Sequence, residues 1–278
     1  LNPGTAGAQF SGGNRMLLGA GMNVNAYGFV AFGNNSNNDY SGGTLLSRTR
    51  HYDGGYRGFG LSLTGGNNGT STPLGTGTVD IFGEVRIEGA TGTAASSGGF
   101  NSNVWVFHPS TRLRFDYATP YTGTTDGRWG DSEAIFLNGG SLELLGDDAA
   151  SVGGSIQYLE TVGAVTAARG ADISVVKRST FFAELTLEDL IRDISTSGTL
   201  TIRHNAGLLG VTGNSNAERL IVTAWSDGSA PMTNGMIDPW IVSRSDHQFL
   251  KYDTALGFQI ITAGSAPANY KTFAGGTL

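Results

Sequence analysis

Glycine is distributed along the whole chain, between short segments in which apolar and polar residues alternate. The sequence holds 44 glycines among 278 residues, about twice the usual share of roughly 7%. Alternation with a period of two is typical of β-strands that bury one face. Gly- and Asn-rich intervals between such segments indicate tight turns. The chain is therefore predicted to be all-β, with many short strands.

The recurring unit is a strand, a glycine corner and a second strand. Residues 79–87 place Gly83 between two alternating segments, and residues 135–144 place the Gly139-Gly140 pair there. The Gly42-Gly43 pair belongs to a weaker copy. We expect these glycines to lie at matching corners of a degenerate repeat.

Such a repeat predicts a parallel β-solenoid with irregular rungs, in which aliphatic and aromatic residues fill the core. An antiparallel β-sandwich would show the same alternation, so this alternative stays open. Residues 1–278 are interpreted as one solenoid segment of a longer protein. The first residue is Leu1, which is consistent with a mature or excised chain that has lost a signal peptide.

One stretch departs from the strand pattern. Leucine and isoleucine recur at helical spacing over residues 187–194, and Thr186 and Asp189 are spaced as in a capping box. We therefore expect a short helix there, in a helical insertion that spans residues 180–198.

Composition excludes several classes of protein. The formal net charge of −6 argues against a nucleic-acid partner, which requires a basic face. No apolar run approaches the roughly 20 residues of a transmembrane helix, so no membrane span is expected in this segment. The absence of cysteine excludes disulfides and cysteine-ligated metals.

Short glycine-containing motifs recur at residues 38–45 (NDYSGGTL), 74–87 and 138–144 (NGGSLEL). They resemble the autotransporter-associated β-strand repeat of bacterial surface proteins, and residues 160–175 and 234–258 are similar to sequences between such repeats. The resemblance implies a right-handed parallel β-helix of the passenger type, exported and displayed at the cell surface. It carries no catalytic residues, and the uneven spacing here departs from a regular repeat.

A cluster of carboxylates offers an enzymatic alternative. Asp126, Asp131 and Glu133 lie close to Trp129 in the sequence, and glycoside hydrolases use paired carboxylates. The resembled fold class also includes polysaccharide-cleaving enzymes. The same segment contains the Thr, Asp and Gly residues of an ordinary turn, so both interpretations stay open.

Aromatic residues supply the remaining binding candidates. Trp105, Phe107, Phe115 and Tyr117 lie close in the sequence and mostly alternate with other residues. They can form a core stack or a surface that contacts glycans or a neighbouring subunit. The core interpretation is favoured for Phe107 and Phe115, and both remain open for Trp105 and Tyr117.

No cofactor or metal is expected. No two of the four histidines have the close spacing of a zinc motif. Asp147 and Asp148 carry oxygen ligands of the kind that calcium prefers, but the glycine-rich nonapeptide of calcium β-rolls is absent.

These observations favour an extracellular structural protein at the bacterial cell surface over an enzyme. We expect a β-solenoid module of a surface fibre, sheath or autotransporter-like passenger. Its expected partners are copies of itself, adjoining repeats of the same chain and surface glycans, with head-to-tail assembly through open strand edges. The alternative is a carbohydrate-binding or carbohydrate-cleaving β-helix protein.

Overall fold

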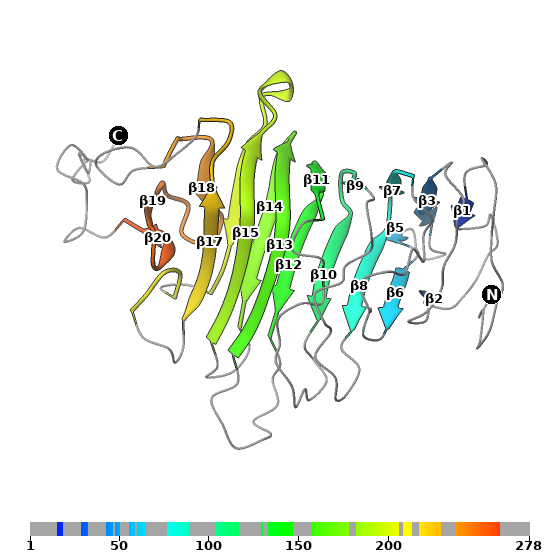
Figure 1. Cartoon of the computed structure of the whole chain (residues 1–278), viewed down its shortest axis with the longest axis horizontal. Coiled ribbons are helices and arrows are strands. Elements are labelled where there is room, and N and C mark those ends of the chain that lie inside the picture. The colour runs from blue at the N-terminus through cyan, green and yellow to red at the C-terminus, as the bar shows by residue number, and fades with distance from the viewer. Residues whose placement is uncertain are drawn as a thin grey trace, which may run out of the picture.

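Two large sheets, sheet A and sheet B, form the body of the protein in a computed structural model (Figure 1). Among the residues that the structure describes, each sheet contains eight strands, and successive strands of the two sheets alternate between sheet A and sheet B along the chain. The structure describes residues 16–18, 29–32, 43–46, 48–50, 56–58, 60–64, 77–88, 104–116, 129, 133–146, 157–177, 182–205, 208–212, 217–228 and 237–261.

Sheet A is parallel in every described pairing. Its strands, in spatial order, are β1 (Met16–Leu18), β3 (Thr44–Leu46), β7 (Val79–Ile81), β9 (Trp105–Phe107), β11 (Ile135–Asn138), β13 (Gln157–Ala168), β15 (Phe182–Arg192) and β17 (Glu218–Ala224).

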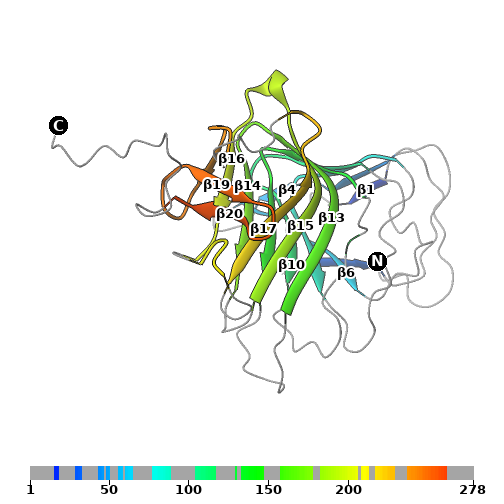
Figure 2. The ribbon, with the colours of Figure 1, turned by 60° about the vertical axis from the view of Figure 1, so that its left-hand side comes forward.

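Sheet B is parallel as well and faces sheet A (Figures 1 and 2). Strand β14 contacts β11, β15 and β17 across the space between the sheets. The strands of sheet B, in spatial order, are β18 (Ile241–Ser243), β16 (Leu200–Arg203), β14 (Ala171–Val176), β12 (Ser141–Leu145), β10 (Arg112–Asp116), β8 (Glu84–Glu88), β6 (Gly60–Thr64) and β2 (Phe29–Phe32).

Two small antiparallel pairs accompany the sheets. They are β4 (Arg48–Arg50) with β5 (Tyr56–Gly58), and β19 (Leu250–Asp253) with β20 (Gly257–Ile260). The predicted all-β class and parallel pairing are therefore confirmed. The antiparallel-sandwich alternative is wrong for both main sheets, because every described pairing within them is parallel.

Rows of apolar side chains fill the space between the sheets. Equivalent positions in neighbouring strands of one sheet lie about 30 residues apart, as the paired Trp105 and Ile135 do. Buried side chains therefore lie next to buried side chains of the neighbouring strands, because parallel pairing puts paired side chains on the same face of the sheet. The central buried rows are Val85, Leu113, Leu142, Ile173 and Ile202 in sheet B, and Val79, Trp105, Ile135, Val165 and Leu190 in sheet A.

The glycine corners are only partly equivalent. Gly83 lies between β7 and β8, and the Gly139-Gly140 pair lies between β11 and β12, so both connect sheet A to sheet B. Gly43 instead comes directly before β3, where the chain enters sheet A. The prediction that all three lie at matching corners is therefore wrong for Gly43.

The predicted helix over residues 187–194, within the insertion 180–198, is also wrong. Strand β15 continues to Arg192, and only Ile194–Thr196 form a turn of 3-10 helix. Buried side chains alternate up to Leu187, and the next buried one is Leu190 because exposed Glu188 shifts the alternation by one residue. That shift in the strand produced the three-residue spacing that resembled a helix.

Candidate functional site

The structure places two predicted binding residues, Trp105 and Trp129, in the core. Both side chains are fully buried, and their rings meet edge to face with centroids 5.0 Å apart. Trp129 also meets Phe115 edge to face. Trp105 thus takes the core position that its alternation allowed, and neither indole presents a face on which a sugar could stack.

Glu133 is buried as well, and its backbone oxygen accepts a 3.4 Å hydrogen bond from the indole N–H of Trp129. Both described members of the proposed sugar site, Trp129 and Glu133, are therefore buried. The other predicted residues lie outside the described part of the chain: Tyr117, Asp126, Asp131 and, for calcium, Asp147 and Asp148.

A buried carboxylate holds Trp129 in place. Glu160 lies on β13 with only 1% of its surface exposed, and it accepts the backbone N–H of Trp129 at 2.7 Å. An amide in an irregular connection needs a partner once it is buried, and this carboxylate supplies one from inside the sheet. The alternation of β13 gives a sequence signal for it, since Glu160 shares the inward face with Tyr158 and Val162.

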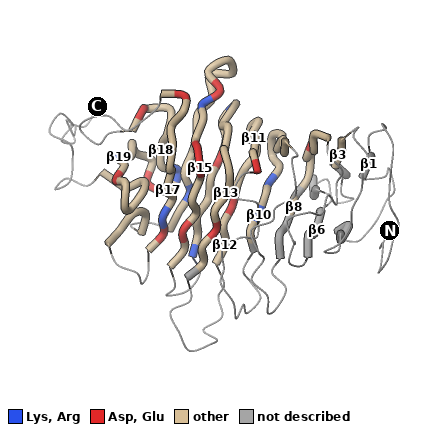
Figure 3. The backbone as a smooth tube through the Cα atoms, viewed as in Figure 1, with Lys and Arg blue, Asp and Glu red and all other residues tan. Residues whose placement is uncertain are grey.

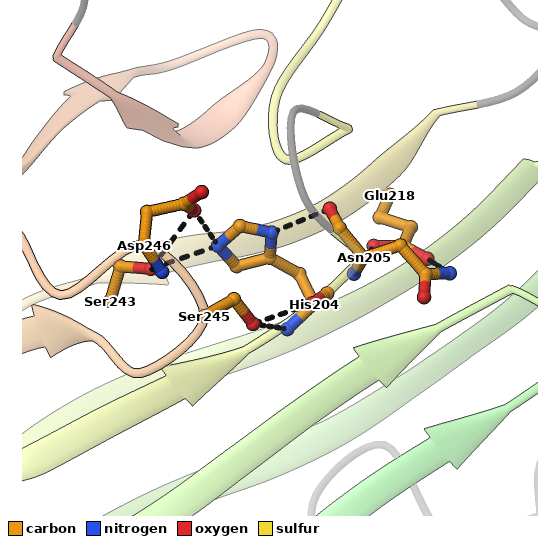
Figure 4. Close-up of polar contacts among 6 residues, drawn as sticks. All are labelled: His204, Asn205, Glu218, Ser243, Ser245 and Asp246. Atoms are coloured by element: carbon orange, nitrogen blue, oxygen red, sulfur yellow. Dashed lines mark hydrogen bonds and ion pairs between the residues drawn. The ribbon is translucent and has the colours of Figure 1, made fainter.

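A second group of polar side chains, the His204 cluster, joins the ends of β16 and β18 to β17 (Figure 4). Pairing of Ile202 with Ser243 carries His204, just after β16, alongside the turn that follows β18. The cluster consists of His204, Asn205, Glu218, Ser243, Ser245 and Asp246.

The imidazole of His204 is fully buried and contacts oxygen atoms at both nitrogens. Nδ1 lies 2.8 Å from the backbone oxygen of Asn205. Nε2 lies 3.0 Å from Oγ of Ser243 and 2.9 Å from Oδ2 of Asp246. A carbonyl oxygen only accepts, so Nδ1 must carry a proton.

This arrangement differs from a Ser-His-Asp catalytic triad. In a triad the serine and the aspartate contact opposite ring nitrogens, whereas Ser243 and Asp246 both face Nε2 of His204. The hydroxyl of Ser243 is also buried, and it accepts the backbone N–H of Asp246 at 3.0 Å. The histidine consequently links two segments of chain and is not a base that reaches a substrate.

Glu218 is the second buried carboxylate of this region. It accepts backbone N–H groups from Lys177 at 2.8 Å and Asn205 at 2.6 Å, and the side-chain amide of Asn205 at 2.6 Å. Burial raises the pKa of Glu218 from its ordinary 4.5 to about 7, while these hydrogen bonds and the charge of Lys177 oppose the increase. Glu218 thus ties the connections after β14 and β16 to the start of β17.

The outer face of sheet B carries ion pairs. Arg112 and Arg114 both contact Oε2 of Glu143 on the neighbouring strand, at 3.1 Å and 2.6 Å. Acidic and basic residues are interspersed along the described strands (Figure 3). Cross-strand pairs of this kind stabilise a sheet modestly, and a mixed-sign face gives no strong field for a charged ligand.

No metal-binding geometry occurs within the described ranges, where no three His, Cys, Asp or Glu side chains are grouped to hold an ion. His108 is engaged by Asp80 at 3.1 Å and stacks on Phe82. Within the same described residues, no helix is long and apolar enough to cross a membrane.

Comparison with protein-family models, with curated proteins and with solved structures found no match to this chain. Function is therefore inferred from the fold and from these polar clusters. No pattern in the sequence indicates the His204 cluster, because 41 positions separate His204 from Ser245 and only the register of β16 with β18 brings them together.

Proposed function

We propose that this chain is a structural module of an extracellular protein at the bacterial cell surface. The observation that carries the proposal is the alternation of the chain between two parallel sheets, with buried side chains in register from strand to strand. Repetition of this kind builds a long, rigid body from local contacts, which is what a fibre, sheath or passenger domain requires.

The proposal includes a right-handed solenoid winding. Parallel strands of one sheet joined through a crossover are right-handed in about 98% of cases, and here each crossover runs through the opposite sheet. The resemblance to autotransporter-associated repeats supports the same winding and an exported location. Adjoining repeats of the same protein are then the natural partners of this segment.

A structural role is favoured over catalysis by the uses of the polar groups. Glu160, Glu218 and His204 are buried and bonded to backbone or neighbouring side chains. The two described tryptophans of the predicted sugar site are core residues. These residues hold segments of the chain together, and they do not support the enzyme alternative.

Surface location is tested by labelling cells of the source organism with an antibody raised against the purified chain. Intact cells should be labelled as strongly as permeabilised cells. Labelling that appears only after permeabilisation would overturn the proposal. A parallel screen against neutral and acidic polysaccharides should show no turnover, and depolymerisation of any of them would move the protein to the enzyme alternative.

A further inference from the structure

Residues 237–261 close one end of both sheets, and we call this segment the end cap. It contains β18, the turn after it and the antiparallel pair β19–β20 (Figure 1). The outermost strands at this end are β17 in sheet A and β18 in sheet B. An outermost strand normally exposes unpaired N–H and C=O groups that recruit another strand, so the partners of those groups decide whether this end can grow.

Backbone and hydroxyl groups cover the free edge of β17. The carbonyl oxygen of Ala217 accepts the N–H of Ala183 on β15. Every second residue from Glu218 onwards therefore directs its backbone N–H and C=O groups away from β15, towards the free edge. The N–H of Glu218 donates to Leu208 at 3.0 Å, and its carbonyl accepts from Gly210 at 2.8 Å.

Tyr252 of the end cap covers the next part of that edge. The hydroxyl of Tyr252 accepts the N–H of Val222 at 2.7 Å and donates to the carbonyl of the same residue at 2.8 Å. One side chain therefore satisfies both outward backbone groups of Val222, which a further strand would otherwise pair.

The hairpin β19–β20 also lies directly against β17. Gly257 has φ +72°, and a Cβ at this position would overlap the carbonyl oxygen of Leu220. The rings of Tyr252, Phe258 and Trp225 pack edge to face beneath the hairpin. The close approach at Gly257 leaves no space for another strand beside Leu220.

The free edge of β18 is covered by its own turns. Trp240 and Arg244 bond to β16, whereas Ile241 and Ser243 direct their N–H groups outwards. Ile241 donates to Asp238 at 3.1 Å, and Ser243 donates to Gln248 at 2.9 Å. Both sheets are therefore closed at the same end, by the end cap together with the segment around Leu208 and Gly210.

At the other end of the body, the outermost described strands are β1 in sheet A and β2 in sheet B. Sheet A runs from β1 to β17 and sheet B from β2 to β18, and every described strand pair within each sheet is parallel. A second copy displaced along the stack would bring its β1 to β17 and its β2 to β18 in the parallel sense. The partner that fits the covered edges is thus another copy of this chain.

We propose that the turns on either side of β18 and the hairpin β19–β20 block head-to-tail association, and that their release exposes the edges of β17 and β18 as a docking surface for β1 and β2 of a second copy. This inference concerns assembly and does not rest on a cell-surface location. In this proposal, head-to-tail association of two copies requires these parts of the end cap to move first.

Two substitutions open the cap without touching the core rows. Tyr252→Phe removes the hydroxyl and leaves both backbone groups of Val222 unpaired, which favours the open form by roughly tenfold. Gly257→Val adds a side chain where Leu220 leaves no space and where φ is positive. Sedimentation velocity over a concentration series should show a monomeric parent chain, and about tenfold tighter association in Tyr252→Phe, with a larger shift in Gly257→Val.

Two controls keep the experiment decisive. Leu113→Ala in the distant core lowers stability without opening the cap, and it should stay monomeric at an equal loss of melting temperature. Adding Val222→Pro to Tyr252→Phe removes the exposed N–H and blocks a strand ladder, so association should return to the parent level. The proposal is overturned if the cap variants stay monomeric or if Leu113→Ala associates equally. Either result leaves the surface-labelling test unaffected.

Discussion

Glu218 combines deep burial with three N–H donors, and its protonation should therefore affect folding. Its pKa lies near 7 in the folded chain and near 4.5 when unfolded, so the folded state holds the proton more tightly. The contribution to stability is fully present below about pH 4.5 and is lost as the pH rises through 7. One pKa unit corresponds to about 1.4 kcal/mol, which sets the loss at about 3 kcal/mol.

Glu218→Gln tests this assignment, because glutamine does not titrate. Urea unfolding of the parent chain between pH 5 and pH 8 should show a falling free energy of unfolding. The variant should lose this slope, and Glu188→Gln, at an exposed position on β15, should retain it. Parallel pH curves for the parent chain and Glu218→Gln would show that another group titrates.

The buried carboxylates were accessible to sequence reasoning, and the partners they bind were not. Alternation places Glu160 on the same face as Val162, and Glu218 on the same face as Leu220, so their inward direction could be predicted from the sequence. The donors come from Trp129, Lys177 and Asn205 in irregular connections, where no periodicity fixes the path of the chain. The same limit applies to Trp129, whose turn-like neighbours gave no sign that the indole is buried.

At the scale of elements, the phase shift of β15 is shared by the strand beside it. Buried positions in β13 change from even to odd numbers after Val162, and those in β15 change from odd to even after Leu187. Val162 and Leu187 are paired, so both strands shift at the same level. Pairing resumes in the same register at Ala164 and Asp189, and the pattern of one strand alone cannot distinguish such a shift from a helical period.

The corner after β11 depends on the absence of a side chain at Gly140. A Cβ there would lie 2.6 Å from both Cβ and the carbonyl oxygen of Phe107 on the neighbouring strand, so the backbone of β9 would have to move. Gly140→Ala is expected to reduce the free energy of unfolding by about 3 kcal/mol, at the upper end of overpacking effects.

Gly228→Ala is the matched comparison for that substitution. Gly228 has φ +81° and no atom within 4 Å of a Cβ, so alanine there carries only the conformational cost of about 1 kcal/mol. Urea unfolding measures both losses. Equal losses would mean that the contact with Phe107 relaxes freely and that the corner is not tightly packed.

At the scale of the whole molecule, the sequence predicted an all-β chain of parallel strands because alternation and corners recur along it. It did not reveal the end cap, since Tyr252 and Gly257 acquire their roles only beside the edge of β17. Strand edges are defined by the order of strands in space, and no local pattern records that order. Head-to-tail assembly through open strand edges stays a prediction.

Each strand of the two sheets pairs with its neighbours, so a local loss of stability should affect the neighbouring strands most and should decrease with distance along the sheets. Leu142 on β12 is fully buried and is paired with Leu113 on β10 and Ile173 on β14. Leu142→Ala opens a cavity that costs about 2–5 kcal/mol. Amide hydrogen exchange should therefore speed up in β10, β12 and β14, and stay unchanged in the distant hairpin β19–β20. Arg203→Ala, at an exposed position on β16, should change none of these rates. Equal acceleration in every strand would show instead that the two sheets unfold as one unit, because then the loss of one side chain would be felt at both ends alike.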